Sequence, residues 1–77
     1  MAKPYEGYPS WNSWNVSLWI NNDYNLYSRA YNMVQEEGMR RAIIILTAYW
    51  KGKRTPDGGV FNRRSIALAL EGMDEYV

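Results

Sequence analysis

The sequence predicts a compact, mainly α single domain of three or four helices, with an extended aromatic N-terminal arm. Three observations lead to this prediction. The chain has 77 residues, which is enough for one hydrophobic core but not for two domains. Apolar residues recur with helical spacing over 23–50 and again over 63–71. Residues that break helices gather outside these stretches, in 1–10 and 51–59.

Residues 1–10 are expected to form the extended arm, because two prolines and a glycine there disfavour a regular helix. Four aromatic residues recur at every third position: Tyr5, Tyr8, Trp11 and Trp14. This is the repeat of a polyproline-type segment, which would set the four rings along one side. A frayed terminus with a coincidental spacing is the alternative.

The stretch Trp11–Asp23, WNSWNVSLWINND, holds three of the four tryptophans. A Trp side chain buries about 150–250 Å², so the stretch is either the centre of the fold or the face that meets a partner. Within it, residues 15–21 fit a helix capped by Ser13 or a half-buried strand. We favour the helix, because the following residues are helical, and expect the tryptophan block to pack against a helix at 39–50.

Asp23 then offers an N-cap for a helix that runs to Glu37 and ends at Gly38, a favourable C′ residue. One stripe of this helix is apolar or aromatic and is expected in the core: Tyr24, Tyr27, Tyr31 and Val34. A third helix is predicted at 39–50. Its centre is apolar nearly all round, so we expect it to be the most buried element.

The segment after that helix predicts a turn, a last helix and a tail. Thr55–Gly59, TPDGG, has the residue types of a tight turn. Asn62 is placed to cap a helix over Arg63–Glu71, and Met73–Val77 is expected to be a short acidic tail.

Composition excludes several kinds of chemistry. The chain has no cysteine and no histidine, so it has no disulfide, thiol nucleophile, imidazole base or standard zinc set. No two carboxylates have the spacing of a recognisable catalytic motif, and Gly58-Gly59 lacks the Lys-Ser/Thr that follows in a phosphate-binding loop. We therefore expect no enzymatic activity, no metal and no cofactor.

The length and the apolar runs set two further expectations. No window approaches the ~20 apolar residues of a membrane span, and the N-terminus lacks a signal sequence, so we expect a cytoplasmic protein. A core of this size rarely supplies more than about 3–5 kcal/mol. The four tryptophans, seven tyrosines and one phenylalanine, or a second copy of the chain in a homodimer, are the available sources of additional burial.

The net charge of +1 hides an uneven distribution. Seven basic residues fall between Arg40 and Arg64, where Asp57 is the one acidic residue. Five of the seven are candidates for contact with a partner: Lys51, Lys53, Arg54, Arg63 and Arg64. Rings are interleaved with these charges, as in a groove for single-stranded nucleic acid, although the pI of about 8.0 is low for such a protein. Trp50, directly before this segment, is expected to cover the core.

The aromatic arm is a second candidate surface. Trp and Tyr often dominate the binding energy of protein interfaces, which makes Tyr5, Tyr8 and Trp11 candidates for contact with a partner protein. Asparagines beside the tryptophans have a structural use, because an amide can satisfy backbone groups in turns or accept from an indole N–H.

The pattern WNxWNVxLWIxND at 11–23, with Leu26-Tyr27, Thr55-Pro56-Asp57-Gly58 and Ala69-Leu70-Glu71-Gly72 after it, resembles a family of small uncharacterised proteins carried by bacteriophages and other mobile elements. The resemblance implies no catalytic residues but does imply a setting, because such proteins are often inhibitors of host machinery. It leads us to expect a non-enzymatic inhibitor of a bacterial defence complex, an anti-CRISPR or similar, that contacts a host protein or nucleoprotein. The alternative is a small nucleic-acid-binding protein that uses the basic segment 40–64.

Overall fold

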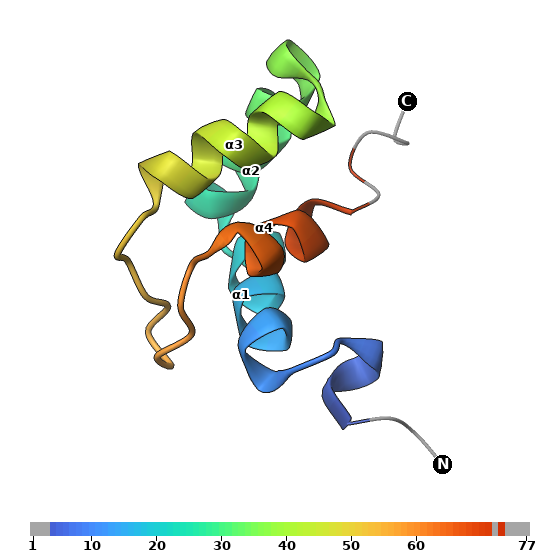
Figure 1. The fold of residues 1–77 in the computed structure, drawn as a ribbon, viewed down its shortest axis with the longest axis vertical. Coiled ribbons are helices and arrows are strands. Elements are labelled where there is room, and N and C mark those ends of the chain that lie inside the picture. Colours follow the sequence, from blue (N-terminus) through green and yellow to red (C-terminus); the bar gives the residue numbers. More distant parts are fainter. Residues whose placement is uncertain (1–3, 72, 74–77) are drawn as a thin grey trace.

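Four α-helices follow an N-terminal 3-10 turn in the computed structural model, which describes residues 4–71 and 73 (Figure 1). The elements are η1 (Pro4–Gly7), α1 (Trp11–Asn22), α2 (Tyr24–Glu37), α3 (Met39–Tyr49) and α4 (Arg63–Leu70). The Cα radius of gyration is 11.9 Å, close to the roughly 11.5 Å of a compact chain of this length. The predicted compact, mainly α domain is confirmed.

Helix α1 begins earlier than predicted. Its N-cap is Ser10, whose hydroxyl accepts a hydrogen bond from the Ser13 N–H at 3.1 Å, so Ser13 is a buried first-turn residue and not the cap. Residues 15–21 are helical, which confirms the favoured alternative. Because Ser10 provides the same capping hydroxyl directly after Pro9, the helix can take in Trp11 and Trp14.

The prediction that the N-terminal arm has a polyproline-type conformation is wrong. Residues 4–7 form a 3-10 turn, and the Tyr8 N–H closes back onto the Tyr5 carbonyl at 2.9 Å. A repeat of three residues is shared by a polyproline helix and a 3-10 helix, and positions three apart also neighbour one another on an α-helix. The three-residue spacing of the aromatic side chains therefore does not distinguish between these backbone conformations.

The corners between α1, α2 and α3 follow the local signals that predicted them. Asp23 ends α1 and caps α2, with its carboxylate accepting from the Leu26 N–H at 3.1 Å. Gly38 joins α2 to α3 at φ +84°, a conformation that glycine adopts without steric cost. Its N–H donates to the Val34 carbonyl at 2.9 Å, which closes the end of α2.

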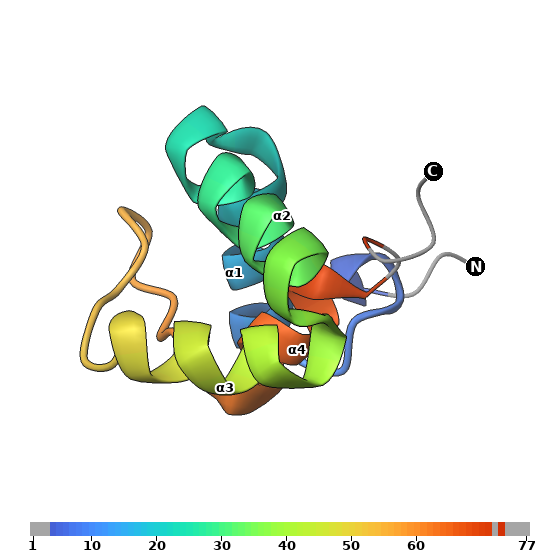
Figure 2. The same cartoon turned by 90° about the horizontal axis from the view of Figure 1, so that it is seen from above.

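The four helices pack in a cycle, in which each contacts two others. Helix α1 has its most extensive contact with α4, α2 bridges α1 and α3, and α3 lies against α4 (Figure 2). The expected packing of the tryptophan block against the helix at 39–50 is therefore wrong. Two small side chains of α1, Ser13 and Ser17, are buried as well.

The core receives side chains from all four α-helices and from the segments that flank α4. These side chains are Val16, Ile20, Ala30, Val34, Ala42, Leu46, Trp50, Phe61, Ile66, Ala69, Leu70 and Met73. Trp50 is buried, as predicted, and its ring centroid lies 5.2 Å from that of Phe61. Met73 is also buried, so the predicted tail does not begin there; residues 74–77 lie outside the described part of the chain.

Two burial predictions are wrong. Helix α3 is not the most buried element, because only Ala42 and Leu46 are buried within it and Ile44 is 53% exposed. Tyr24, assigned to the core stripe of α2, is 81% exposed. It is the first residue of α2 and is not among the side chains that pack on the core, although its position has the right periodicity. None of the helices in the described residues has the length and apolar character of a membrane span.

Candidate protein-interaction surface

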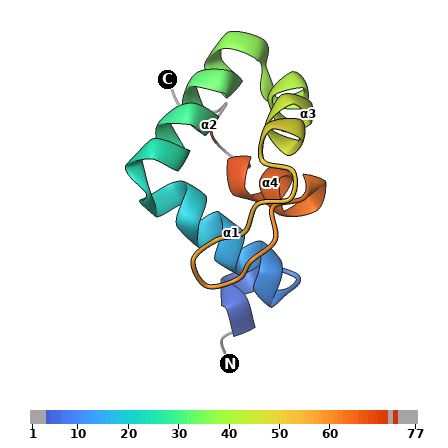
Figure 3. The same cartoon turned by 90° about the vertical axis from the view of Figure 1, so that its left-hand side faces the viewer.

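The loop between α3 and α4, residues 50–62, folds back onto one flank of α1 (Figure 3). Asn12 makes the outer attachment. Its amide nitrogen donates to the Val60 carbonyl at 2.9 Å, and its amide oxygen accepts from the Val60 N–H at 2.7 Å. One side chain thus satisfies both backbone groups of Val60, as a neighbouring strand would.

A second attachment holds the predicted TPDGG turn. The buried Asn15 accepts a hydrogen bond from the Thr55 hydroxyl through Oδ1 and donates through Nδ2 to Asp57 Oδ2 at 3.0 Å. The Thr55 hydroxyl in turn accepts from the Gly59 N–H at 2.8 Å. Trp19 completes the group by donating its indole N–H to the same Asp57 oxygen at 2.9 Å.

We call these five residues, Asn12, Asn15, Trp19, Thr55 and Asp57, the turn clamp. The hydrogen bond from the Trp19 indole, and then that from Asn15, lowers the pKa of Asp57 below its ordinary value, because both favour the charged carboxylate. The clamp links two of the sequence segments on which the resemblance rests, the tryptophan block and the TPDG turn. It gives the asparagines and Trp19 a structural role.

The face of α1 next to the turn clamp is open to solvent. Trp11, Trp14 and Leu18 are spaced at i, i+3 and i+7 and therefore share one face of the helix. Trp11 is 39% exposed and Leu18 is 40% exposed. The Tyr5 ring packs on Trp14 with 6.4 Å between centroids.

Tyr8 extends this face, because its hydroxyl is hydrogen-bonded to the Ser17 hydroxyl at 2.7 Å. A shallow hollow of about 220 Å³ lies beside it. The hollow is lined by Tyr8, Trp14, Ser17, Leu18, Asn21 and Asn22. We call Tyr5, Tyr8, Trp11, Trp14 and Leu18 the outer stripe. It contains all three aromatic residues predicted to contact a partner, and none of its five residues is charged.

The seven basic residues of the segment 40–64 are exposed but do not form one continuous surface. Lys51, Lys53 and Arg54 lie on the loop after α3, and Arg63 and Arg64 occupy the first turn of α4. The two limbs of the loop are joined, since the Phe61 N–H donates to the Lys53 carbonyl at 3.2 Å. This hydrogen bond brings Lys53 close to the start of α4.

The other two basic residues of the segment, Arg40 and Arg41, lie at the opposite end of α3, about 16 Å away for a helix of this length. Arg41 forms an exposed ion pair with Glu37 at 3.0 Å. Three aromatic rings are interleaved with the basic residues in the sequence, and two of them, Trp50 and Phe61, are buried. Tyr49 is the remaining ring, and it is 52% exposed.

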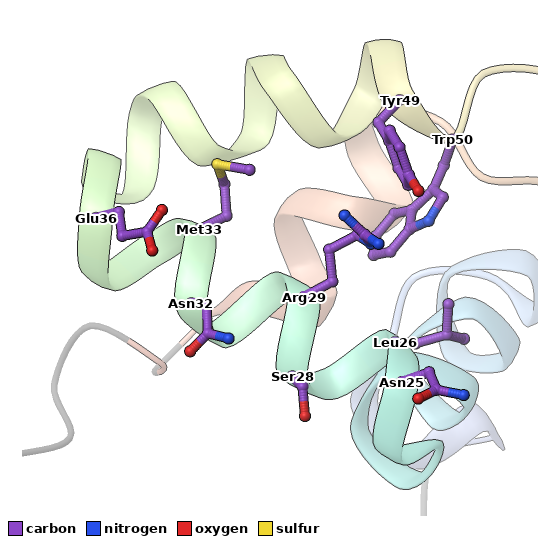
Figure 4. Close-up of a pocket in the computed structure, with 9 residues that line it drawn as sticks. All are labelled: Asn25, Leu26, Ser28, Arg29, Asn32, Met33, Glu36, Tyr49 and Trp50. Carbon is purple, nitrogen blue, oxygen red and sulfur yellow. The ribbon is translucent and has the colours of Figure 1, made fainter.

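The sequence did not predict a groove between α2 and α3. Its volume is about 570 Å³, and the residues that line it are Asn25, Leu26, Ser28, Arg29, Asn32, Met33, Glu36, Tyr49 and Trp50 (Figure 4). The Arg29 guanidinium lies 4.4 Å from the centre of the Tyr49 ring. No periodic pattern connects these two residues, twenty positions apart on different helices.

Within the described residues, no three acidic, histidine or cysteine side chains come together in a way that could hold a metal ion. Comparison with curated proteins and with solved structures found no match. Residues 1–76 match a family described as "Family of unknown function (DUF7249)". Because this match covers nearly the whole chain, the protein belongs to the DUF7249 family.

Proposed function

We propose that this protein is a non-enzymatic binding protein that acts by protein–protein contact through the outer stripe of α1. The observation that carries the proposal is the exposure of Trp11 and Leu18 beside Tyr5 on one uncharged helix face. Contiguous apolar surface that remains exposed on a small domain often marks an interaction site. Trp and Tyr are also the residues that most often dominate binding energy.

The attachment of α1 supports this assignment. One face of the helix is fixed by the core residues Val16 and Ile20, and its flank is fixed to the 50–62 loop by the turn clamp. The outer stripe is thereby held in one arrangement before any partner arrives. Preorganisation reduces the conformational entropy lost on binding, so more of the contact energy is available as affinity.

The finer proposal is that the partner is a bacterial defence complex, such as a CRISPR effector, and that the protein is a phage-type inhibitor of it. This rests on the resemblance to small proteins carried by mobile elements and on the lack of cysteine and histidine chemistry. Asp57, one of the few carboxylates available, already accepts two hydrogen bonds in the turn clamp.

The test combines binding with phage growth. A tagged full chain is used to capture partners from a host lysate, and plaques are counted on defence-positive and defence-negative strains. The variant Trp11→Ser/Leu18→Ser should lose both the captured complex and the advantage on the defence-positive strain. Tyr24→Ser removes an even more exposed ring on α2 and is the matched control, which should behave as the unmodified protein.

Two results would count against the proposal. Equal plaque numbers on both strains would remove the counter-defence role. Retention of the captured partner by the Trp11/Leu18 variant, with loss in the Tyr24 control, would move the contact surface from α1 to α2.

Nucleic-acid binding is the second candidate function, and the joined limbs of the loop favour it by grouping five exposed cations, Lys51, Lys53, Arg54, Arg63 and Arg64. It predicts a mobility shift of a labelled oligonucleotide at about 50 mM salt that weakens steeply as salt rises. The burial of Trp50 and Phe61 argues against base stacking on those rings. If no shift occurs at the low salt concentration, this candidate is eliminated.

A further inference from the structure

The groove between α2 and α3 combines an apolar floor with one cation near its middle. Leu26, Met33 and Trp50 provide the floor, and Arg29 reaches across from α2 towards Tyr49 at the end of α3 (Figure 4). A volume of about 570 Å³ lies within the roughly 300–1,000 Å³ of typical ligand sites. The groove is separate from the outer stripe, whose residues belong to η1, α1 and the connection between them.

Arg29 is held in place without being neutralised. Its guanidinium lies 4.4 Å from the Tyr49 ring centre, where the negative face of the ring attracts a cation. This contact with the ring leaves guanidinium N–H groups able to donate hydrogen bonds to a carboxylate. Among residues 4–71 and 73, the one ion pair is that between Arg41 and Glu37, so Arg29 has no carboxylate partner there.

The second charge in the groove limits what can fill it. Glu36 lies seven residues beyond Arg29 on α2, about 10 Å along the helix. A polyanion that extended through the groove would place further negative charge against Glu36. A ligand with one carboxylate flanked by apolar groups can pair its charge with Arg29 and keeps further negative charge away from Glu36.

We propose that this groove binds a segment of a partner protein in which an acidic residue is flanked by apolar residues. The carboxylate pairs with the edge of Arg29, the apolar side chains lie on Leu26, Met33 and Trp50, and Tyr49 acts as a positioning residue for the guanidinium. That the occupant is a protein segment rests on the proposed function. The site itself does not require the outer stripe.

The test uses acetyl-Leu-Asp-Leu-amide as the probe, titrated into the isotope-labelled full chain while amide and indole resonances are recorded. We expect saturable shifts at Arg29, Met33 and Trp50. The neutral probe acetyl-Leu-Asn-Leu-amide should bind at least about tenfold more weakly, because it cannot form the charge-assisted pair. Inorganic phosphate is titrated in parallel to separate a protein segment from a free anion.

Matched variants assign the roles. Arg29→Gln should weaken binding of the aspartate probe at least about tenfold. Arg64→Gln, which removes an exposed arginine on α4, should leave this affinity unchanged. Tyr49→Phe keeps the ring and should retain binding, while Tyr49→Leu should reduce it and should also reduce the preference for the aspartate probe over the asparagine probe. The melting temperature of each variant is measured to show that the fold is kept.

The proposal is overturned if the aspartate probe gives no saturable shift up to about 10 mM, which corresponds to negligible affinity. It is also overturned if both peptides bind equally, if the shifts centre on Arg63 and Arg64, or if phosphate shifts Arg29 as strongly as the aspartate probe does. The Trp11→Ser/Leu18→Ser protein should bind the probe normally. Loss of function through the outer stripe can therefore be distinguished from failure of the groove.

Discussion

Gly59 is the position where the turn clamp has least room, and Gly59→Ala is the sharpest test of it. A Cβ atom at this position would lie 2.6 Å from Asn15 Oδ1 and 3.2 Å from Thr55 Oγ1, whereas ordinary contact begins at 3.4 Å. Asn15 cannot yield freely, because Oδ1 accepts from the Thr55 hydroxyl and Nδ2 donates to Asp57. The added methyl group must therefore break the clamp or distort the backbone.

The cost can be estimated from these contacts. Overpacking in a tight site costs about 1–3 kcal/mol, and a buried polar group that loses its partner costs about 1–3 kcal/mol. The reduced entropy of the unfolded chain returns about 0.4–1 kcal/mol. At the middle of these ranges, we expect Gly59→Ala to lower the free energy of unfolding by about 3 kcal/mol, which corresponds to a fall of roughly 12–24 °C in melting temperature for a domain of this size.

The assay is a double-mutant cycle measured by urea denaturation. In the Asn15→Ser protein the shorter side chain has no amide oxygen for the new methyl group to meet. Gly59→Ala should therefore lower the free energy of unfolding much less in that protein. Gly58→Ala is the matched control. Its Cβ would meet nothing within 4 Å, but its φ is +100°, so its cost arises from the backbone and should persist in the Asn15→Ser protein.

Additive costs for Gly59→Ala and Asn15→Ser, within about 0.3–0.5 kcal/mol, would refute the clamp as the source of the effect. An unchanged stability for Gly59→Ala would show that the loop relaxes without breaking the hydrogen bonds of Asn15. In either case the two sequence segments would be less tightly linked than the contacts indicate.

Three further predictions concern stability. Trp50→Ala should lose about 3–5 kcal/mol, the range for large aromatic truncations in cores, and should abolish cooperative thermal unfolding followed by circular dichroism. Lys53→Ala/Arg54→Ala should keep the melting temperature within a few degrees, since exposed substitutions usually lie within about ±0.5 kcal/mol. The lowered pKa of Asp57 stabilises the folded state above the ordinary value of 3.8, and this contribution should disappear as the pH falls below 3.8 through the lower folded-state pKa. The melting temperature of Asp57→Asn should therefore fall less over that acid range than that of the unmodified protein, and an identical pH dependence would contradict the hydrogen bonds from Trp19 and Asn15.

The helix boundaries that could be predicted are those set by adjacent residues. Asp23 and Asn62 cap α2 and α4 as expected, and Gly38 separates α2 from α3. Each signal acts over three or four residues, so one sequence contains all the information needed. The Asn62 cap even forms a reciprocal capping box with Ser65, which closes the first turn of α4 from both sides.

The packing of the helices could not be predicted in the same way. Periodicity shows that a face is apolar but does not show which other helix covers it. The sequence therefore predicts that the tryptophan block packs on α3, whereas α1 packs most extensively on α4. Periodicity also treats every turn of a helix alike. It therefore predicts Tyr24 in the core, although this first residue of α2 is 81% exposed.

The candidate sites depend on contacts between distant parts of the chain. Asn12 meets Val60 and Asn15 meets Asp57 across more than forty residues, and no local pattern marks either pair. The basic segment shows the opposite case, in which residues that are close in sequence lie far apart in the structure. Arg41 and Lys51 are close in sequence, but a straight helix carries them to opposite ends of α3.

The tryptophans show why a single assignment for the whole block could not succeed. Trp19 donates to Asp57 in the turn clamp, Trp14 packs with Tyr5, and Trp11 remains exposed at the start of the same helix. A helix turns successive positions to different surroundings, so residues that are adjacent in sequence serve different purposes. Loss of the Trp19 indole should therefore be measured as lower stability, whereas loss of Trp11 should be measured as weaker contact with a partner at unchanged stability. If both substitutions lowered the melting temperature equally, the outer stripe would be part of the packed structure and not a surface kept free for binding.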